Sequence, residues 1–322
     1  MQTAIILAFI LTGLTNDAKQ IQVTDKTSSQ ESAAPAPSFE DILTWLPPNT
    51  ESLLVANGPF ECHRVDTKES QDLLRMLRRM CAGPVLGEVQ DKKLTGQKIS
   101  LAVHGGRRFR APKQLGLGPY EGCSVVVFER DIGKGHELVA RSLQSESKQV
   151  IRMQQQQVYC FEKQYEKDTW NIYVVQPAKN LLICATDKGY LAEVLRRREK
   201  KASDRAFPVA LPQWKCVNRK APFWALREFN GPRAIAGVPA ESELPGMVYC
   251  FDPANEKIGK FHYFSNSPNA ADVLSASWSR GAKATVKQKE AGVIEVIVDA
   301  TEDKNGNFPF ALMLSFGFIF CV

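Results

Sequence analysis

Apolar residues recur at two different spacings along the chain, and the spacing separates helices from strands. In residues 66–80, Leu73, Leu74, Leu77 and Met80 recur at a spacing of three to four residues, and arginines lie largely off this stripe. Such positions share one face of an α-helix, so we predict a helix there. Further helices are predicted at 38–46, 134–143, 188–200 and 269–278.

Short apolar runs bounded by polar turns lie between these helices and predict β-strands. Several of the turns are short, which is typical of antiparallel meanders. We therefore predict an α+β fold in which antiparallel sheets carry helices packed on one face. The predicted strands are 53–57, 99–104, 124–129, 157–163, 169–175, 181–185, 282–289 and 292–299.

The beginning and end of the first helix are also marked in the sequence. Ser38 is suited to the N-cap position, and Asp41 follows at the third helical position, where a carboxylate is favourable. The helix must end at Leu46, because the next residues are Pro47 and Pro48 and a residue before proline avoids the helical conformation.

Two predicted hairpins resemble each other. Residues 158–162 read VYCFE and residues 248–252 read VYCFD, and Tyr173 and Tyr263 match at the same offset. We interpret this echo as the trace of an ancient duplication, and a chance likeness between two hairpins is the alternative. The predicted organisation is a signal peptide (1–18), a disordered linker (19–37) and two related lobes (38–205 and 206–322).

The first residues suggest export. Residues 4–14 (AIILAFILTGL) form an apolar run of the length found in signal peptides, and it is too short to cross about 30 Å of hydrocarbon. The preceding Met-Gln-Thr lacks Lys and Arg, so a buried first strand or helix is the alternative. Residues 19–37 are mainly Gln, Ser, Thr, Ala and Pro and favour a flexible tether. We predict a periplasmic, cell-surface or extracellular location.

The last residues are apolar too. Residues 308–322 contain no charged side chain. As a helix they would extend about 22 Å, which is short of a membrane span. We predict a core element that closes the second lobe, either a helix or a strand, and a tail anchor is the alternative.

Composition excludes several classes of protein. The chain of 322 residues is 44% hydrophobic and 24% charged, with Gly 21 and Pro 18, so it is neither collagen-like nor largely disordered. A mean hydropathy of −0.24 excludes a polytopic membrane protein. The net charge of +6 points toward anionic partners.

The sequence resembles uncharacterised exported proteins of planctomycete-type bacteria in two short segments. The first is LPPNTESLLVANGPF at 46–60, and the second is ATD at 185–187 followed by Tyr190, Leu191 and Val194 to Arg197. The resemblance implies bacterial export. It brings no established activity, cofactor or catalytic residue.

Known catalytic and cofactor motifs are missing from the sequence. His104-Gly105-Gly106 is similar to the loop that supplies oxyanion-hole amides in esterases, but the chain has no Gly-x-Ser-x-Gly nucleophile, so we interpret these residues as a turn. The eight cysteines show no C-x-x-C pair, and four of them lie in strand-like runs typical of buried thiols; disulfide bonds remain the alternative. We expect no cofactor and no metal ion.

Two basic patches are the candidate binding residues. Residues 101–120 hold four cations and no acid, and a second cluster lies at the end of the helix predicted at 188–200. Both could contact an anionic partner, although a solvated helix end is the alternative for the second. The candidate anion-contact residues are Arg107, Arg108, Arg110, Lys113, Arg196, Arg197, Arg198, Lys200 and Lys201.

These observations favour an exported, non-catalytic interaction protein of the envelope or extracellular space. Its partner is predicted to be an anionic envelope polymer or protein. Nucleic acid is not expected, because Phe109 is the one aromatic residue among the charges of the first patch. No membrane span is expected in the mature chain. The alternative is a hydrolase whose site is not visible in the sequence.

Overall fold

The folded region is known from a computed structural model. The predicted signal peptide, residues 19–35 of the predicted linker and the apolar run 308–322 lie outside the residues that it describes. The structure describes residues 36–61, 73–83, 97–108, 120–165, 168–228, 246–252, 254, 258–265, 267–278 and 283–299.

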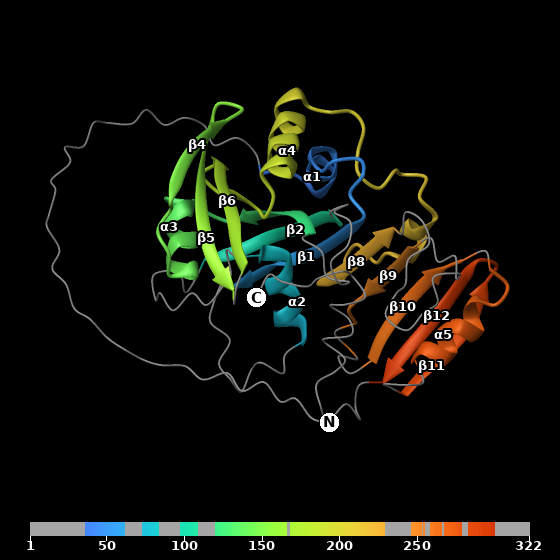
Figure 1. Cartoon of the computed structure of the whole chain (residues 1–322). Helices are drawn as coiled ribbons and strands as arrows, with labels where there is room; N and C mark the ends of the chain where they lie inside the picture. The colour runs from blue at the N-terminus through green and yellow to red at the C-terminus, as the bar shows by residue number, and fades with distance from the viewer. Residues whose placement is uncertain are drawn as a thin grey trace, which may run out of the picture. The chain divides into compact units, whose positions relative to one another are not determined.

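The described strands form one twelve-stranded sheet with the order β11-β12-β10-β9-β8-β1-β2-β3-β7-β6-β5-β4 (Figure 1). Neighbouring strands pair antiparallel throughout. The predicted α+β class is confirmed. The strands are β1 (Ser52–Glu61), β2 (Lys98–Arg108), β3 (Tyr120–Phe128), β4 (Gln149–Met153), β5 (Gln156–Tyr165), β6 (Asp168–Ala178), β7 (Leu181–Ala185), β8 (Phe223–Glu228), β9 (Gly246–Cys250), β10 (Ile258–Phe264), β11 (Lys283–Glu290) and β12 (Val293–Asp299).

The middle of the sheet joins the regions predicted as two lobes. β1 pairs with β8 from Ser52 opposite Arg227 to Ala56 opposite Phe223. This β1–β8 seam makes the sheet continuous across the predicted boundary at residues 205 and 206. The division of the chain into two related lobes therefore stays a prediction.

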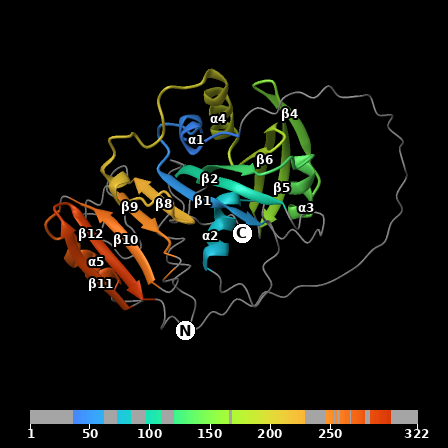
Figure 2. The ribbon, with the colours of Figure 1, turned by 180° about the vertical axis from the view of Figure 1, so that it is seen from behind.

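Helices cover both faces of the sheet. Along β1, Leu53 and Val55 belong to one hydrophobic core, whereas Leu54 and Ala56 belong to the other. Figures 1 and 2 show α1 and α4 side by side near β1 and β2, with α2 on the other side of these strands. For residues 38–205 the prediction of helices on one face is thus wrong. The helices are α1 (Phe39–Trp45), α2 (Leu73–Ala82), α3 (Gly135–Leu143), α4 (Lys188–Lys200), α5 (Ala270–Trp278) and the 3₁₀ helix η2 (Pro212–Cys216).

Local sequence signals explain where the best-marked helices begin. Ser38 and Asp41 form a reciprocal capping box at α1, as predicted, and the hydrogen bonds from Ser38 lower the pKa of the Asp41 carboxyl. The side chain of Asp187 accepts a hydrogen bond of 2.7 Å from the backbone N–H of Tyr190 at the start of α4.

Two sequence interpretations change in the structure. His104-Gly105-Gly106 lies inside β2 and is not a turn. Gly105 makes room for Leu46, because a Cβ atom there would lie 2.6 Å from a methyl carbon of that leucine. The two echoed segments fall on β5 and β9, which occupy different positions relative to the β1–β8 seam, so their likeness does not correspond to equivalent places in the sheet.

Candidate anion-contact site

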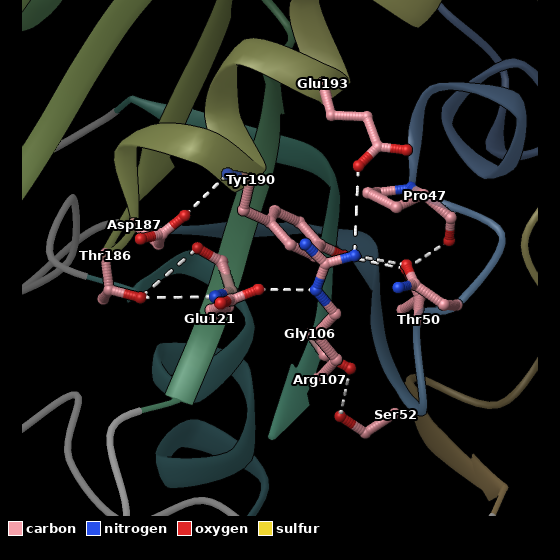
Figure 3. A network of polar contacts seen from close by, with 12 residues as sticks. Pro47, Thr50, Ser52, Gly106, Arg107, Glu121, Thr186, Asp187, Tyr190 and Glu193 are labelled. Carbon is pink, nitrogen blue, oxygen red and sulfur yellow. Dashed lines mark hydrogen bonds and ion pairs between the residues drawn. The ribbon is translucent and has the colours of Figure 1, made fainter. Parts of the chain in front are cut away.

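Arg107 lies near the end of β2 and is bound by neighbouring polar side chains (Figure 3). Its Nε is 2.5 Å from Oε2 of Glu121, and its Nη1 is 3.9 Å from Oε2 of Glu193. The same Nη1 donates a hydrogen bond to Oδ1 of Asn49. Two carboxylates therefore already compensate the charge of Arg107, whose side chain is 22% exposed.

The guanidinium of Arg107 also lies over a buried tyrosine. Its central carbon is 5.2 Å from the ring centroid of Tyr190. The Tyr190 hydroxyl is 2.8 Å from Oγ1 of Thr50, which itself donates to the carbonyl oxygen of Pro47 at 2.6 Å. Because the single hydroxyl proton of Thr50 is used in that bond, the Tyr190 hydroxyl is the donor between them. The contact holds the 47–50 turn against α4.

This contact joins residues 46–60 to residues 185–197. Thr50 belongs to segment 46–60, and Tyr190 belongs to segment 185–197. Thr50 and Tyr190 therefore have a structural role, because their contact fixes the start of α4 beside the entry to β1.

Arg197 was a candidate contact residue, and the structure buries it. Its side chain is 6% exposed. Its Nε donates to the carbonyl oxygen of Thr44 at 3.0 Å, and its Nη1 and Nη2 donate to the side chain and carbonyl oxygen of Asp204 at 3.1 and 2.5 Å. Arg197 therefore fastens α4 to α1 and to the following loop, and it is not an external anion contact.

The rest of the α4 cluster divides into a packed and an exposed part. The guanidinium carbon of Arg198 is 5.4 Å from the ring centroid of Trp45, and partial burial lowers the pKa of this group. Arg196, Lys200 and Lys201 are exposed. These three residues form the surface that we call the α4 basic end.

Most of the first patch cannot be placed. Arg108 ends β2, but its side chain lies outside the described part of the structure, as do Arg110 and Lys113. Arg107 nevertheless relates the two patches, because its partner Glu193 lies on α4 seven residues before Lys200. Seven helical residues rise about 10 Å, so Arg107 adjoins the same helix that carries the α4 basic end.

A second group of arginines surrounds the start of α1, and sequence reasoning did not bring its members together. The carboxylate of Glu40 forms ion pairs with Arg205 and Arg219, the latter at 2.6 Å. The guanidinium carbons of these arginines lie 5.3 and 4.7 Å from the ring centroid of Trp214. Sequence spacing offers no signal for this cluster, since Glu40 and Arg219 are 179 residues apart.

His104 and Ser124 form a buried hydrogen-bonded pair on adjacent strands. The Nδ1 atom of His104 is 2.8 Å from Oγ of Ser124, and the residues are 3% and 2% exposed. Burial lowers the pKa of His104 to about 4, so the ring is neutral at pH 7. Gly83 closes over the pair, because a Cβ atom there would lie 2.7 Å from the serine oxygen. The arrangement is a polar contact within the core.

The described cysteines are free thiols, and Cys62 and Cys321 lie outside the described residues. Burial raises the pKa of Cys81 and of Cys123, which disfavours their thiolates. Within the described ranges, His, Cys, Asp and Glu side chains form no group of three or more that could hold a metal ion.

Comparisons with known proteins add little. No protein-family model matches the chain, and no curated protein matches its sequence. Two crystal structures of TP0453 are similar to it. Form I has a TM-score of 0.46 with 10% identity, covering 86% of this chain and 97% of that one. Form IV has a TM-score of 0.44 with 11% identity, covering 88% of this chain and 97% of that one. Similarity this weak supports no inference about function.

In the part of the chain that the structure describes, the helices are too short or too polar to cross a bilayer.

Proposed function

We propose that the protein is exported and acts without catalysis, as an interaction protein of the cell envelope or extracellular space. Its partner is an anionic polymer or protein, and the α4 basic end makes the contact. The observation that carries this proposal is the exposure of Arg196, Lys200 and Lys201 at the end of one helix.

The packing of α4 supports this assignment. Arg197 is bonded to Thr44 and Asp204, and Arg198 lies over Trp45, so the helix end is fixed to α1. The neighbouring cations therefore project from a rigid element, which lowers the entropy lost when a partner binds. They also lie where the helix dipole favours positive charge, so the same residues have a structural role that is small, about 0.3–1 kcal/mol each.

Fluorescence anisotropy with labelled dextran sulfate, used as an anionic polymer, tests the proposal. The wild-type protein is expected to bind at 50 mM NaCl and to lose affinity as salt screens the charges. The triple variant R196E/K200E/K201E is expected to bind at least about tenfold more weakly, because attraction becomes repulsion at the contact.

A matched variant separates this local contact from a general charge effect. Arg130, Lys148 and Lys179 are exposed cations elsewhere in the described structure. R130E/K148E/K179E changes the net charge equally and is expected to alter binding less than threefold. Equal weakening by both variants would assign binding to the overall charge of +6 and overturn the proposed site. Absence of wild-type binding would overturn the function itself.

A hydrolase is the second candidate, and the hydrogen bond between His104 and Ser124 is the observation that favours it. A catalytic serine would react with a fluorophosphonate probe, and the S124A variant would lose that label. Because both residues are buried, we expect no labelling of the folded protein.

Export is tested separately. N-terminal sequencing of the native protein, together with its subcellular fraction, is expected to find a mature chain that begins after residue 18 outside the cytoplasm. Recovery from the cytoplasmic fraction of a chain that still begins at Met1 would contradict export.

A further inference from the structure

Cys216 and Cys250 lie together although they are 34 residues apart in the chain. Cys216 ends η2, and Cys250 ends β9, against which η2 packs. The Sγ of Cys250 is 3.6 Å from the carbonyl oxygen of Cys216, and it accepts a hydrogen bond of 3.3 Å from the backbone N–H of Asn218. The sulfur of Cys250 therefore lies against the backbone at 216–218.

Exposure distinguishes these two thiols from the other described cysteines. Cys216 and Cys250 are partly exposed, whereas Cys81, Cys123, Cys160 and Cys184 are buried. Oxidants in solution react with thiols that they can reach. Among the described cysteines, the two that are accessible are thus also the two that lie against each other.

The charges around the pair set the order in which the thiols react. Burial raises the pKa of the Cys216 thiol; the ammonium groups of Lys289 and Lys215 lower it, and the carboxylates of Glu290 and Glu295 raise it to a smaller extent. Burial raises the pKa of Cys250 to about 11, and the thiolate of Cys216 adds to this increase. Cys216 therefore supplies the first thiolate, because the thiolate is the reactive form.

We propose that Cys216 and Cys250 are a redox-active dithiol that closes to a disulfide on reaction with a small-molecule disulfide such as glutathione disulfide. The Cys216 thiolate attacks one sulfur of glutathione disulfide, forms a mixed disulfide and releases one glutathione thiolate. The Cys250 thiolate then attacks the Cys216 sulfur and releases the second. Two protein thiols are oxidised, and one glutathione disulfide is reduced to two glutathione molecules.

Closure would attach η2 covalently to the sheet. The segment held in this way includes Trp214, which contacts Arg205 and Arg219 beside α1. A bond that closes a loop of this length stabilises the folded state by restricting the unfolded chain. The melting temperature of the oxidised protein is therefore expected to rise by about 5 °C.

Peptide mapping of the folded, full-length wild-type protein tests the proposal directly. The protein is incubated with glutathione disulfide, its remaining thiols are alkylated, and it is digested with trypsin without reduction. We expect a disulfide between the peptide CVNR, residues 216–219, and the peptide of residues 234–257 that contains Cys250. Cys81 and Cys123 are expected to become alkylated after unfolding and not before.

Variants control for other pairings. C216S and C250S should each abolish the melting-temperature rise, whereas C160S should retain it, since Cys160 lies on β5 away from the pair in the strand order. A bond from Cys216 or Cys250 to Cys62 or Cys321, or recovery of Cys250 in alkylated form beside a glutathionylated Cys216, would overturn the proposal. The mapping uses wild-type protein, so a variant that fails to fold does not affect this result. Its outcome is also independent of binding to anionic polymers.

Discussion

The two sides of the β1–β8 seam are covered differently. From β1 to β7, α1 and α4 pack on one face of the sheet, and α2 and α3 pack on the other. From β8 to β12, α5 packs on one face, while the other carries η2 beside β9 and the exposed side chains of Lys260, Lys287 and Lys289. The seam thus separates a region in which helices cover both faces of the sheet from one in which part of a face carries exposed lysines.

Two histidines illustrate the difference. His104 on β2 is 3% exposed and contacts the neutral hydroxyl of Ser124. His262 on β10 is 8% exposed, but its Nε2 is 3.4 Å from both Glu295 and Lys289. Burial lowers the pKa of His262, with Lys289 acting in the same direction and Glu295 opposing it. The two histidines are similarly buried, but His104 contacts a neutral hydroxyl, whereas His262 contacts charged side chains.

The largest expected effect is a loss of stability in acid that depends on His104. Its pKa is about 4 in the folded protein and about 6.5 in the unfolded chain, so the unfolded state takes up the proton first as the pH falls. The contribution is fully present above pH 6.5 and is lost between about pH 6.5 and 4, by about 3 kcal/mol. Urea denaturation of wild type and H104Q from pH 7.5 to 4 measures it.

H262Q is the matched variant for this prediction. H104Q is expected to flatten the pH profile of unfolding free energy, whereas H262Q should retain most of it, since Glu295 partly offsets the lowered pKa of His262. A flat profile in H262Q and an unchanged one in H104Q would reverse the proposed contrast between the two sides of the seam.

Removal of the Arg197 side chain is expected to have the next largest effect. R197A leaves the carbonyl oxygens of Thr44 and Asp204 without their charged donor and should lower the unfolding free energy by about 2 kcal/mol. R196A, at the exposed neighbouring position, should change it by less than about 0.5 kcal/mol. Similar losses in both variants would show that Arg197 is not the fastening residue.

A smaller effect is expected at Tyr190. Y190F removes the hydroxyl that donates to Thr50 and should cost about 1 kcal/mol of unfolding free energy. Y173F, on β6, serves as the control and should cost less than about 0.5 kcal/mol. If Y190F in a T50V background costs as much as in wild type, the hydroxyl contact is not the source of the loss.

The smallest effect is expected on the charged face beyond β9. Lys260 and Lys287 are exposed on β10 and β11, so K260A and K287A should each change the unfolding free energy by less than about 0.5 kcal/mol. Chemical denaturation measures this change. A loss above about 1 kcal/mol would mean that these lysines contribute to packing, and the two sides of the seam would differ less than described.

Local signals in the sequence were sufficient to predict where many helices and strands lie. The capping box of Ser38 and Asp41, the stop at Pro47 and the apolar period of α4 act within a few residues, so the sequence predicts them well. The sequence also contained a signal that both faces of the sheet are covered. Leu181–Ala185 is buried at every position, and an unbroken apolar strand is typical of a sheet covered on both sides.

The roles of the candidate arginines could not be predicted in the same way. Arg196 and Arg197 are adjacent in a run of three arginines, yet one is exposed and the other is buried. The difference depends on the Thr44 carbonyl, which is 153 residues away in the chain. Charge patterning locates a cluster of cations, but tertiary contacts decide which of them can meet a partner.

The β1–β8 seam has a consequence for synthesis of the protein. β1 ends at Glu61 and β8 begins at Phe223, so about 160 residues must be made before the partner strand exists. At roughly 5–20 residues per second, the N–H and C=O groups along one edge of β1 remain unpaired for about 10–30 s on the ribosome. An open edge of this kind recruits other strands, so a nascent chain halted before β8 is the species most prone to aggregate. Before β8 is made, β1 is therefore an edge strand of the seven strands that exist, although it is an interior strand of the finished sheet.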